Sequence, residues 1–167
     1  MQLRPLHDAP YPIIDTDPIF SRVIKYMRAS DVALMVGYVP MGPLFMWFME
    51  KFHPTGMSKH NMKRCMVGSL PVSAMFGFMF AYKASSHRFF GFKENAREIK
   101  MYREEWRRMK AKGKPFHGVS SLPLSLQRTA AMYSTGAYFN LDVAPVFNFV
   151  NHPFHGRSKG IIPEEDE

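Results

Sequence analysis

Apolar residues are concentrated in two uncharged blocks of the chain. The first runs from Val32 to Met49 and the second from Cys65 to Tyr82, and each holds 18 residues without a formal charge. As a helix, each block spans roughly 27 Å, against a hydrocarbon core of about 30 Å. The rest of the chain offers only one amphipathic stretch, which is too little to cover two apolar helices from water. The pattern therefore predicts an all-α membrane protein with a two-helix transmembrane hairpin, in preference to two buried helices of a soluble protein.

Small side chains recur at every fourth position of the second block. These positions are Ser69, Ser73, Gly77 and Ala81. Four residues advance a helix by about 400°, so the small side chains form one slowly winding groove. Helices in a bilayer associate through close packing, and small residues at this spacing permit backbone approach. The groove is predicted to be a helix-packing face, and its partner is either the first block, through Gly37 and Gly42, or another protein.

The first block contains two prolines, Pro40 and Pro43. A proline inside a helix removes a backbone donor and clashes with the preceding turn, so a kink is expected near residues 36–39. Kinked helices also occur at transporter sites, but such sites normally add ionisable residues at membrane depth. The first block has no charged residue.

Basic residues flank the two blocks. The connector, residues 50–64, carries four basic residues, whereas eight lie near the outer ends of the blocks. The positive-inside rule therefore favours an inward position for both termini. The formal net charge of +8 could indicate a nucleic-acid partner, but no nucleic-acid-binding module can be read in the chain. Contact with anionic lipid headgroups and acidic neighbouring subunits explains the same charge.

The segments outside the blocks differ in character. The N-terminal segment contains four prolines and is expected to be extended, with a short interfacial helix beginning at Pro18 and capped by Asp17. After the second block, Gly91 is expected to end the helix, and a charged helix is predicted from about Asn95 to Lys112. The predicted organisation is 1–31 extended segment, 32–49 first span, 50–64 connector, 65–82 second span, 83–114 charged helical segment and 115–167 irregular aromatic-rich tail.

The charged helix carries a thin apolar stripe at three- and four-residue spacing. The stripe consists of Ile99, Tyr102, Trp106 and Met109. We interpret it as a docking face rather than a cofactor site. The tail that follows is rich in Phe, Tyr and Leu but has no long periodic run, so its aromatic side chains need a surface that this chain alone does not supply. A larger assembly is implied.

Candidate chemistry is sparse. His152 and His155 have a spacing that can bind a metal ion, but no third ligand is evident and Pro153 disfavours a helical site. The single cysteine, Cys65, excludes an intrachain disulfide and cannot hold an iron–sulfur cluster, which takes four ligands. No phosphate-binding glycine loop and no nucleophile motif is present. We therefore expect no catalytic, metal-binding or cofactor-binding residue, and we leave open a structural phospholipid.

The N-terminal sequence LRPLHDAPYPIIDTDPIFSRVIKYMRASD, residues 3–31, resembles the fungal 21 kDa accessory subunit of mitochondrial NADH:ubiquinone oxidoreductase, respiratory complex I. Its most specific part is HDAPYPIIDTDP, and the likeness in architecture extends over most of the chain. The resemblance implies a non-catalytic supernumerary subunit of the membrane arm, in the mitochondrial inner membrane. Its partners would be other membrane-arm subunits and lipids, with neither nucleic acid nor a small-molecule substrate. Such a subunit would brace core transmembrane helices while its termini strap neighbouring subunits together.

Three other functions remain open. The kinked first block is compatible with a small inner-membrane transporter or translocase component, which substrate flux in liposomes would reveal. A membrane-bound enzyme using His152 and His155 would contain stoichiometric metal. An assembly factor would differ from an accessory subunit only in leaving the finished complex.

Overall fold

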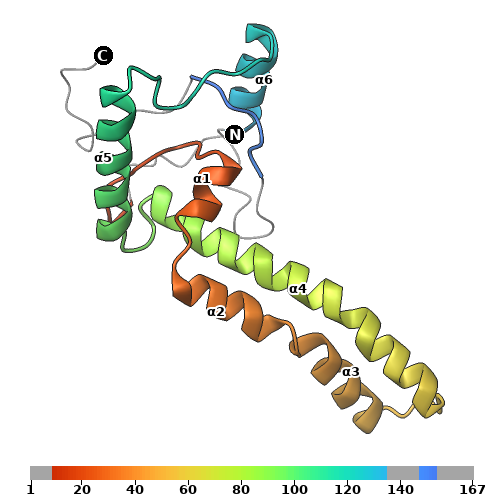
Figure 1. Ribbon diagram of the computed structural model, residues 1–167. Helices are drawn as coiled ribbons and strands as arrows, with labels where there is room; N and C mark the ends of the chain where they lie inside the picture. Colours follow the sequence, from red (N-terminus) through yellow and green to blue (C-terminus); the bar gives the residue numbers. More distant parts are fainter. Residues whose placement is uncertain (1–8, 135–146, 154–167) are drawn as a thin grey trace. The chain divides into compact units, whose positions relative to one another are not determined.

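The computed structural model describes residues 9–134 and 147–153, and over these ranges the chain is helical without any strand (Figure 1). The helices are α1 (Phe20–Lys25), α2 (Ala29–Tyr38), α3 (Met41–Phe52), α4 (Lys59–Phe89), α5 (Ala96–Ala111) and α6 (Leu124–Ser134). The chain forms two compact units. Unit 1 combines residues 1–26 with residues 83–167, and unit 2 comprises Met27–Tyr82.

Unit 2 contains both segments that are long and apolar enough to cross a membrane. They are Ala29–Phe52, which is 24 residues long, and Lys59–Phe89, which is 31 residues long and continues into unit 1. In the most apolar window of the first segment 0% of the residues are buried, and in that of the second 22%. A core helix of a soluble protein is mostly buried, so the exposure of these two segments is typical of helices that meet lipid or another protein.

The first of these segments is divided at its prolines. Helix α2 ends at Tyr38 and α3 begins at Met41, with Pro40 as the residue that caps α3. Pro43 is the third residue of α3, where a backbone N–H has no acceptor within the helix, so its missing donor costs no hydrogen bond there. Val39 and Pro40 keep right-handed helical backbone angles between the two helices, so the prolines interrupt the segment without turning the chain away from a helical path.

Within unit 2, α4 lies alongside α2 and α3 (Figure 1). A Cβ atom built on Gly77 would lie 2.6 Å from the backbone oxygen of Met35 and 2.8 Å from Cβ of Tyr38. The Tyr38 and Phe80 rings stack with their centroids 4.9 Å apart. The absence of a side chain at Gly77 is what permits this close backbone approach.

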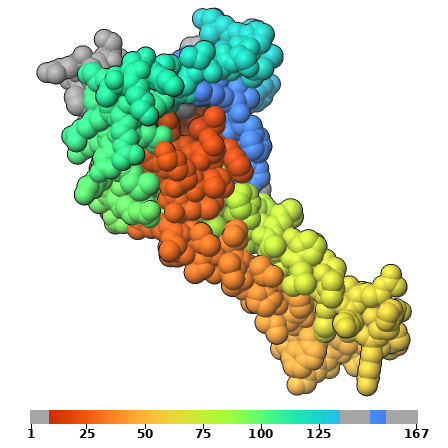
Figure 2. Space-filling model, viewed as in Figure 1, coloured from red at the N-terminus to blue at the C-terminus, as the bar shows by residue number. Residues whose placement is uncertain are grey.

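The outer surface of unit 2 is apolar. Figure 2 shows one face of it along α2, α3 and α4. Large side chains that are about half exposed there include Val36, Leu44, Phe45, Trp47, Phe48, Phe52, Val67, Val72, Met75 and Phe76. The ridge of Val72, Met75 and Phe76 lies on the outside of α4, away from the small residues that face α2 and α3.

Unit 1 is organised around the end of α4. Gly91 has φ +75°, a left-handed conformation that favours glycine, and Phe92 N–H donates to the backbone oxygen of His87. The expectation that Gly91 ends the helix is confirmed, because α4 stops at Phe89. The N-terminal segment lies against this turn, with backbone hydrogen bonds from Tyr11 to Gly91 and from Ile14 to Phe89.

Two local features of unit 1 differ from the sequence-based expectation. Helix α1 is capped by Ile19, without a side-chain hydrogen bond, so the prediction of Asp17 as the cap was wrong. Helix α6 lies in the segment that was expected to be irregular. It is 11 residues long and starts directly after Pro123, whose backbone oxygen accepts a hydrogen bond from Gln127. Its residues, LSLQRTAAMYS, place apolar and polar positions on every face of a helix, so no helical period marks this segment in the sequence.

Candidate functional site

The part of the chain that the structure describes holds no group of three or more His, Cys, Asp or Glu side chains that could bind a metal ion. His155 lies outside the described residues. His152 is 1% exposed, and its Nε2 atom lies 2.6 Å from Oδ2 of Asp17. The side chain of His152 thus contacts Asp17 within unit 1 and connects residues 147–153 to the N-terminal segment.

The Asp17 cluster consists of Asp17, Asn148 and His152. Asn148 donates from Nδ2 to Oδ1 of Asp17 at 2.9 Å, and its backbone oxygen accepts from Phe20 N–H at 2.7 Å. The Phe20 ring contacts Phe147 and Phe149, with centroid separations of 5.5 and 4.7 Å. Residues 147–153 are therefore fastened to the N-terminal segment by polar and aromatic contacts together.

Two further ion pairs are buried in unit 1. Arg22 lies 3.8 Å from Asp15, donates to the backbone oxygen of Phe116 at 3.1 Å and stacks over the Phe116 ring. Arg88, near the end of α4, lies 3.5 Å from Glu98 of α5, and both side chains are at most 5% exposed. Removing one partner of a buried pair leaves an uncompensated charge, so these contacts fix the arrangement of the segments that they join.

The apolar stripe of α5 is divided between the interior and the surface. Tyr102 is 1% exposed and packs against Phe116 at a centroid separation of 4.8 Å. Burial, and the negative charge of Asp15, raise the pKa of the Tyr102 hydroxyl above its ordinary value. Ile99, Trp106 and Met109 remain partly exposed, and Lys110 lies over the Trp106 ring. Only these three residues of the stripe could contact another protein.

The small residues of α4 face α2 and α3 at some positions only. A Cβ atom on Gly42 would collide with Oγ of Ser73 and lie 3.0 Å from the backbone oxygen of Ser69. Both serine hydroxyls donate to backbone oxygens of α4 itself. Ala81 is fully buried, whereas a Cβ atom on Gly37 would meet nothing within 4 Å. The structure brings Gly42, Ser69, Ser73 and Gly77 to the contact and leaves Gly37 outside it.

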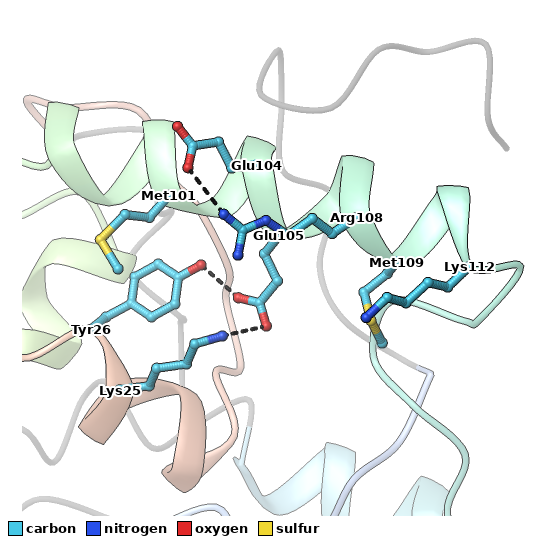
Figure 3. Close-up of a pocket in the computed structure, with 8 residues that line it drawn as sticks. All are labelled: Lys25, Tyr26, Met101, Glu104, Glu105, Arg108, Met109 and Lys112. Carbon is cyan, nitrogen blue, oxygen red and sulfur yellow. Dashed lines mark hydrogen bonds and ion pairs between the residues drawn. The ribbon is translucent and has the colours of Figure 1, made fainter.

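A cavity of about 280 Å³ lies between α1 and α5 in unit 1 (Figure 3). Its lining residues are Lys25, Tyr26, Met101, Glu104, Glu105, Arg108, Met109 and Lys112. Three cations thus face two carboxylates, with a methionine towards each end. Glu104 and Arg108 form an i,i+4 ion pair, at 4.0 Å and largely in solvent. The sequence gives no sign of this cavity, because the residues that α1 and α5 contribute lie about 80 positions apart.

Glu105 lies at the centre of the contact between α1 and α5. It accepts hydrogen bonds from the Tyr26 hydroxyl at 2.7 Å and from Lys25 at 3.0 Å (Figure 3). Burial by itself raises the pKa of Glu105, but the hydrogen bonds from Tyr26 and Lys25 outweigh it and lower the pKa below the ordinary value of 4.5. Burial and the same hydrogen bond raise the pKa of Tyr26, so its hydroxyl remains a donor at neutral pH.

Acid is expected to destabilise unit 1 through Glu105. A carboxyl whose pKa is lowered by folding binds a proton more readily in the unfolded chain. Its contribution to the free energy of unfolding is therefore complete above pH 4.5 and is lost as the pH falls through the pKa of the folded chain. Thermal unfolding of the detergent-purified chain, measured across the acid range, should therefore be less pH-dependent for Glu105→Gln than for the wild type. Equal pH dependence of the two proteins would contradict this role of Glu105.

The fold and these contacts define a helical protein with two candidate membrane spans and a separate polar-cored unit. The sequence model of the family described as "NADH-ubiquinone oxidoreductase complex I, 21 kDa subunit" matches residues 8–94. The NADH-ubiquinone oxidoreductase 20.9 kDa subunit of Neurospora crassa is 42% identical over 147 residues, which cover 87% of this chain and 77% of the Neurospora protein. The chain belongs to the complex I 21 kDa subunit family, as its N-terminal sequence indicated.

Proposed function

We propose that the chain is a non-catalytic accessory subunit of the membrane arm of mitochondrial complex I, which it stabilises by helix packing. The observation that carries the proposal is the apolar outer surface of unit 2, in a chain that belongs to this family. In water such a surface would drive association, whereas in a bilayer it is matched by lipid tails and neighbouring helices. The location that follows is the mitochondrial inner membrane.

In this proposal, unit 2 crosses the membrane as a hairpin. Segments Ala29–Phe52 and Lys59–Phe89 are long enough to span the hydrocarbon core, and only six residues separate them. Trp47 lies near the end of the first segment, with Lys51 over its ring, and such residues are typical of the interface between lipid and water. The distribution of basic residues supports a matrix position for both termini.

Unit 1 would act outside the hydrocarbon core. Its buried ion pairs and the Asp17 cluster hold its segments together, which suits unit 1 to contact with neighbouring subunits. The partly exposed Ile99, Trp106 and Met109 supply apolar contact area on α5. Flavin, iron–sulfur and quinone chemistry would belong to other chains of the complex.

A transporter or translocase component is the second candidate function. The break between α2 and α3 supports it, because broken helices line many transport sites. However, residues 32–49 and 65–82 contain no ionisable side chain that could bind a coupling ion, apart from Cys65 and two tyrosines. The role of a non-catalytic accessory subunit therefore agrees better with the sequence than that of a transporter component does.

Native electrophoresis of detergent-solubilised mitochondria tests the proposed function. We expect the chain in the complex I band, and we expect alkaline carbonate to leave it in the membrane pellet. A C-terminal epitope should resist protease in mitoplasts, in which only the outer membrane is broken. Recovery of the chain outside the complex I band, or its release by carbonate as a soluble monomer, would reject the proposal.

A further inference from the structure

The cavity between α1 and α5 combines features that suit a phosphate group beside an apolar chain. Lys25, Arg108 and Lys112 contribute three positive charges, and Glu104 and Glu105 contribute two negative charges. The lining therefore carries one net positive charge, which a single phosphodiester would neutralise. Met101 and Met109 add flexible apolar surface, which adapts well to irregular ligand shapes.

The charged side chains of the cavity differ in how many contacts they make within the protein. Glu105 is engaged by Tyr26 and Lys25, at 2.7 and 3.0 Å. Arg108 has only a long contact of 4.0 Å with Glu104, and its side chain is 78% exposed. In the described part of the chain, the side chain of Lys112 has no hydrogen bond or ion pair. An anion would thus replace only the exposed pair of Arg108 with Glu104 and no side-chain contact of Lys112. Figure 3 shows Arg108 on the last turn of α5 and Lys112 directly after the helix.

The position of the cavity along the chain indicates the source of the phosphate. Lys25 precedes Ala29, the first residue of the first candidate span, by only four positions. Four residues extend over at most about 14 Å, and the headgroup layer on each side of the hydrocarbon core is about 5–8 Å thick. If the first segment crosses the bilayer, the Lys25 end of the cavity lies at or beside the headgroup layer, whatever the placement of unit 1.

We propose that this cavity binds the phosphodiester of a membrane phospholipid headgroup, with Arg108 and Lys112 as its ligands. The methionines contact the glycerol region, while the Glu105 hydrogen bonds hold α1 and α5 at the required separation. A lipid bound in this way would connect α5 to the membrane surface. The inference rests on the proposed membrane crossing and adds a ligand to it.

Native mass spectrometry of the full chain, purified in detergent, tests the inference with three probes. Phosphatidylglycerol carries the phosphodiester and acyl chains, diacylglycerol lacks the phosphate, and glycerophosphoglycerol keeps the phosphodiester but lacks the acyl chains. We expect phosphatidylglycerol to bind at least tenfold more tightly than either of the other two. Equal binding of diacylglycerol would overturn phosphate recognition, and equal binding of glycerophosphoglycerol would overturn a lipid as the source.

The double variant Arg108→Gln/Lys112→Gln removes the two proposed ligands. We expect about a tenfold loss of phosphatidylglycerol affinity, because each ligand contributes a charge-assisted hydrogen bond. The matched control, Arg107→Gln/Lys114→Gln, removes two exposed charges within two residues of Arg108 and Lys112 but outside the cavity lining, and should bind as the wild type does. An equal loss of phosphatidylglycerol affinity in both double variants would show that the effect arises from net charge alone, and would reject the site.

The outcome is separable from that of the proposed function. Should the chain sit in the complex I band and resist carbonate while Arg108→Gln/Lys112→Gln binds phosphatidylglycerol normally, only the lipid site is rejected. Release of the chain by carbonate would reject the membrane crossing, and with it the argument that places the cavity at the headgroup layer.

Discussion

Replacing Gly77 with isoleucine is expected to disrupt the packing of α4 on α2 and to destabilise the chain by about 3 kcal/mol. A Cβ atom at this position would lie 2.6 Å from the backbone oxygen of Met35, which can move only together with α2. The displacement would also open the stacked contact between Tyr38 and Phe80. Thermal unfolding of the detergent-purified chain should show a lower midpoint, and less of the chain should be retained in the complex I band.

Gly68→Ile is the matched control, because Gly68 lies in the same helix and a Cβ atom there would meet nothing within 4 Å. Both substitutions change helix propensity equally, so the difference between them reports the packing of α4 on α2. Wild-type stability of Gly77→Ile, or equal destabilisation by the two substitutions, would show that this contact does not hold the two segments together.

The two candidate spans were predictable from the sequence because each is a continuous block of uncharged residues. The residues at which these helices begin and end were harder to predict. Helix α4 begins at Lys59 and ends at Phe89, well beyond the uncharged block from Cys65 to Tyr82. A helix can continue past the end of an apolar block, because its backbone hydrogen bonds depend on local conformation and its charged ends can reach water or a partner. Hydropathy therefore locates the apolar part of a helix and not its ends.

The buried charges of unit 1 were not predictable in the same way. Asp17 looks like a helix cap in its local context, but its partners, Asn148 and His152, lie 131 and 135 positions further along the chain. Arg22 and Glu98 resemble solvent-exposed charges, although each is less than 9% exposed. The available signal was that Asp15 and Asp17 stand among apolar residues in the stretch IIDTDPIF, where carboxylates on a free surface would be unexpected.

Substitution of Asp17 by alanine is expected to release residues 147–153 from the N-terminal segment and to cost about 3 kcal/mol. The carboxylate is 5% exposed and contacts Asn148 at 2.9 Å and His152 at 2.6 Å, so its removal leaves two buried polar side chains without their acceptor. Chymotrypsin should then cleave next to Phe147 faster than in the wild type, and the thermal midpoint should fall.

A double-mutant cycle separates this contact from a general loss of stability. If Asp17 acts through Asn148, the effects of Asp17→Ala and Asn148→Ala will not add, because the second substitution removes a donor that the first has already left without an acceptor. Asp17→Asn should be milder than Asp17→Ala, since its amide oxygen can still accept one hydrogen bond. Strictly additive losses, or a chymotrypsin cleavage rate that is unchanged by Asp17→Ala, would mean that residues 147–153 are held by other contacts, such as the backbone hydrogen bond of Phe20 to Asn148 and the packing of the Phe20 ring on Phe147 and Phe149.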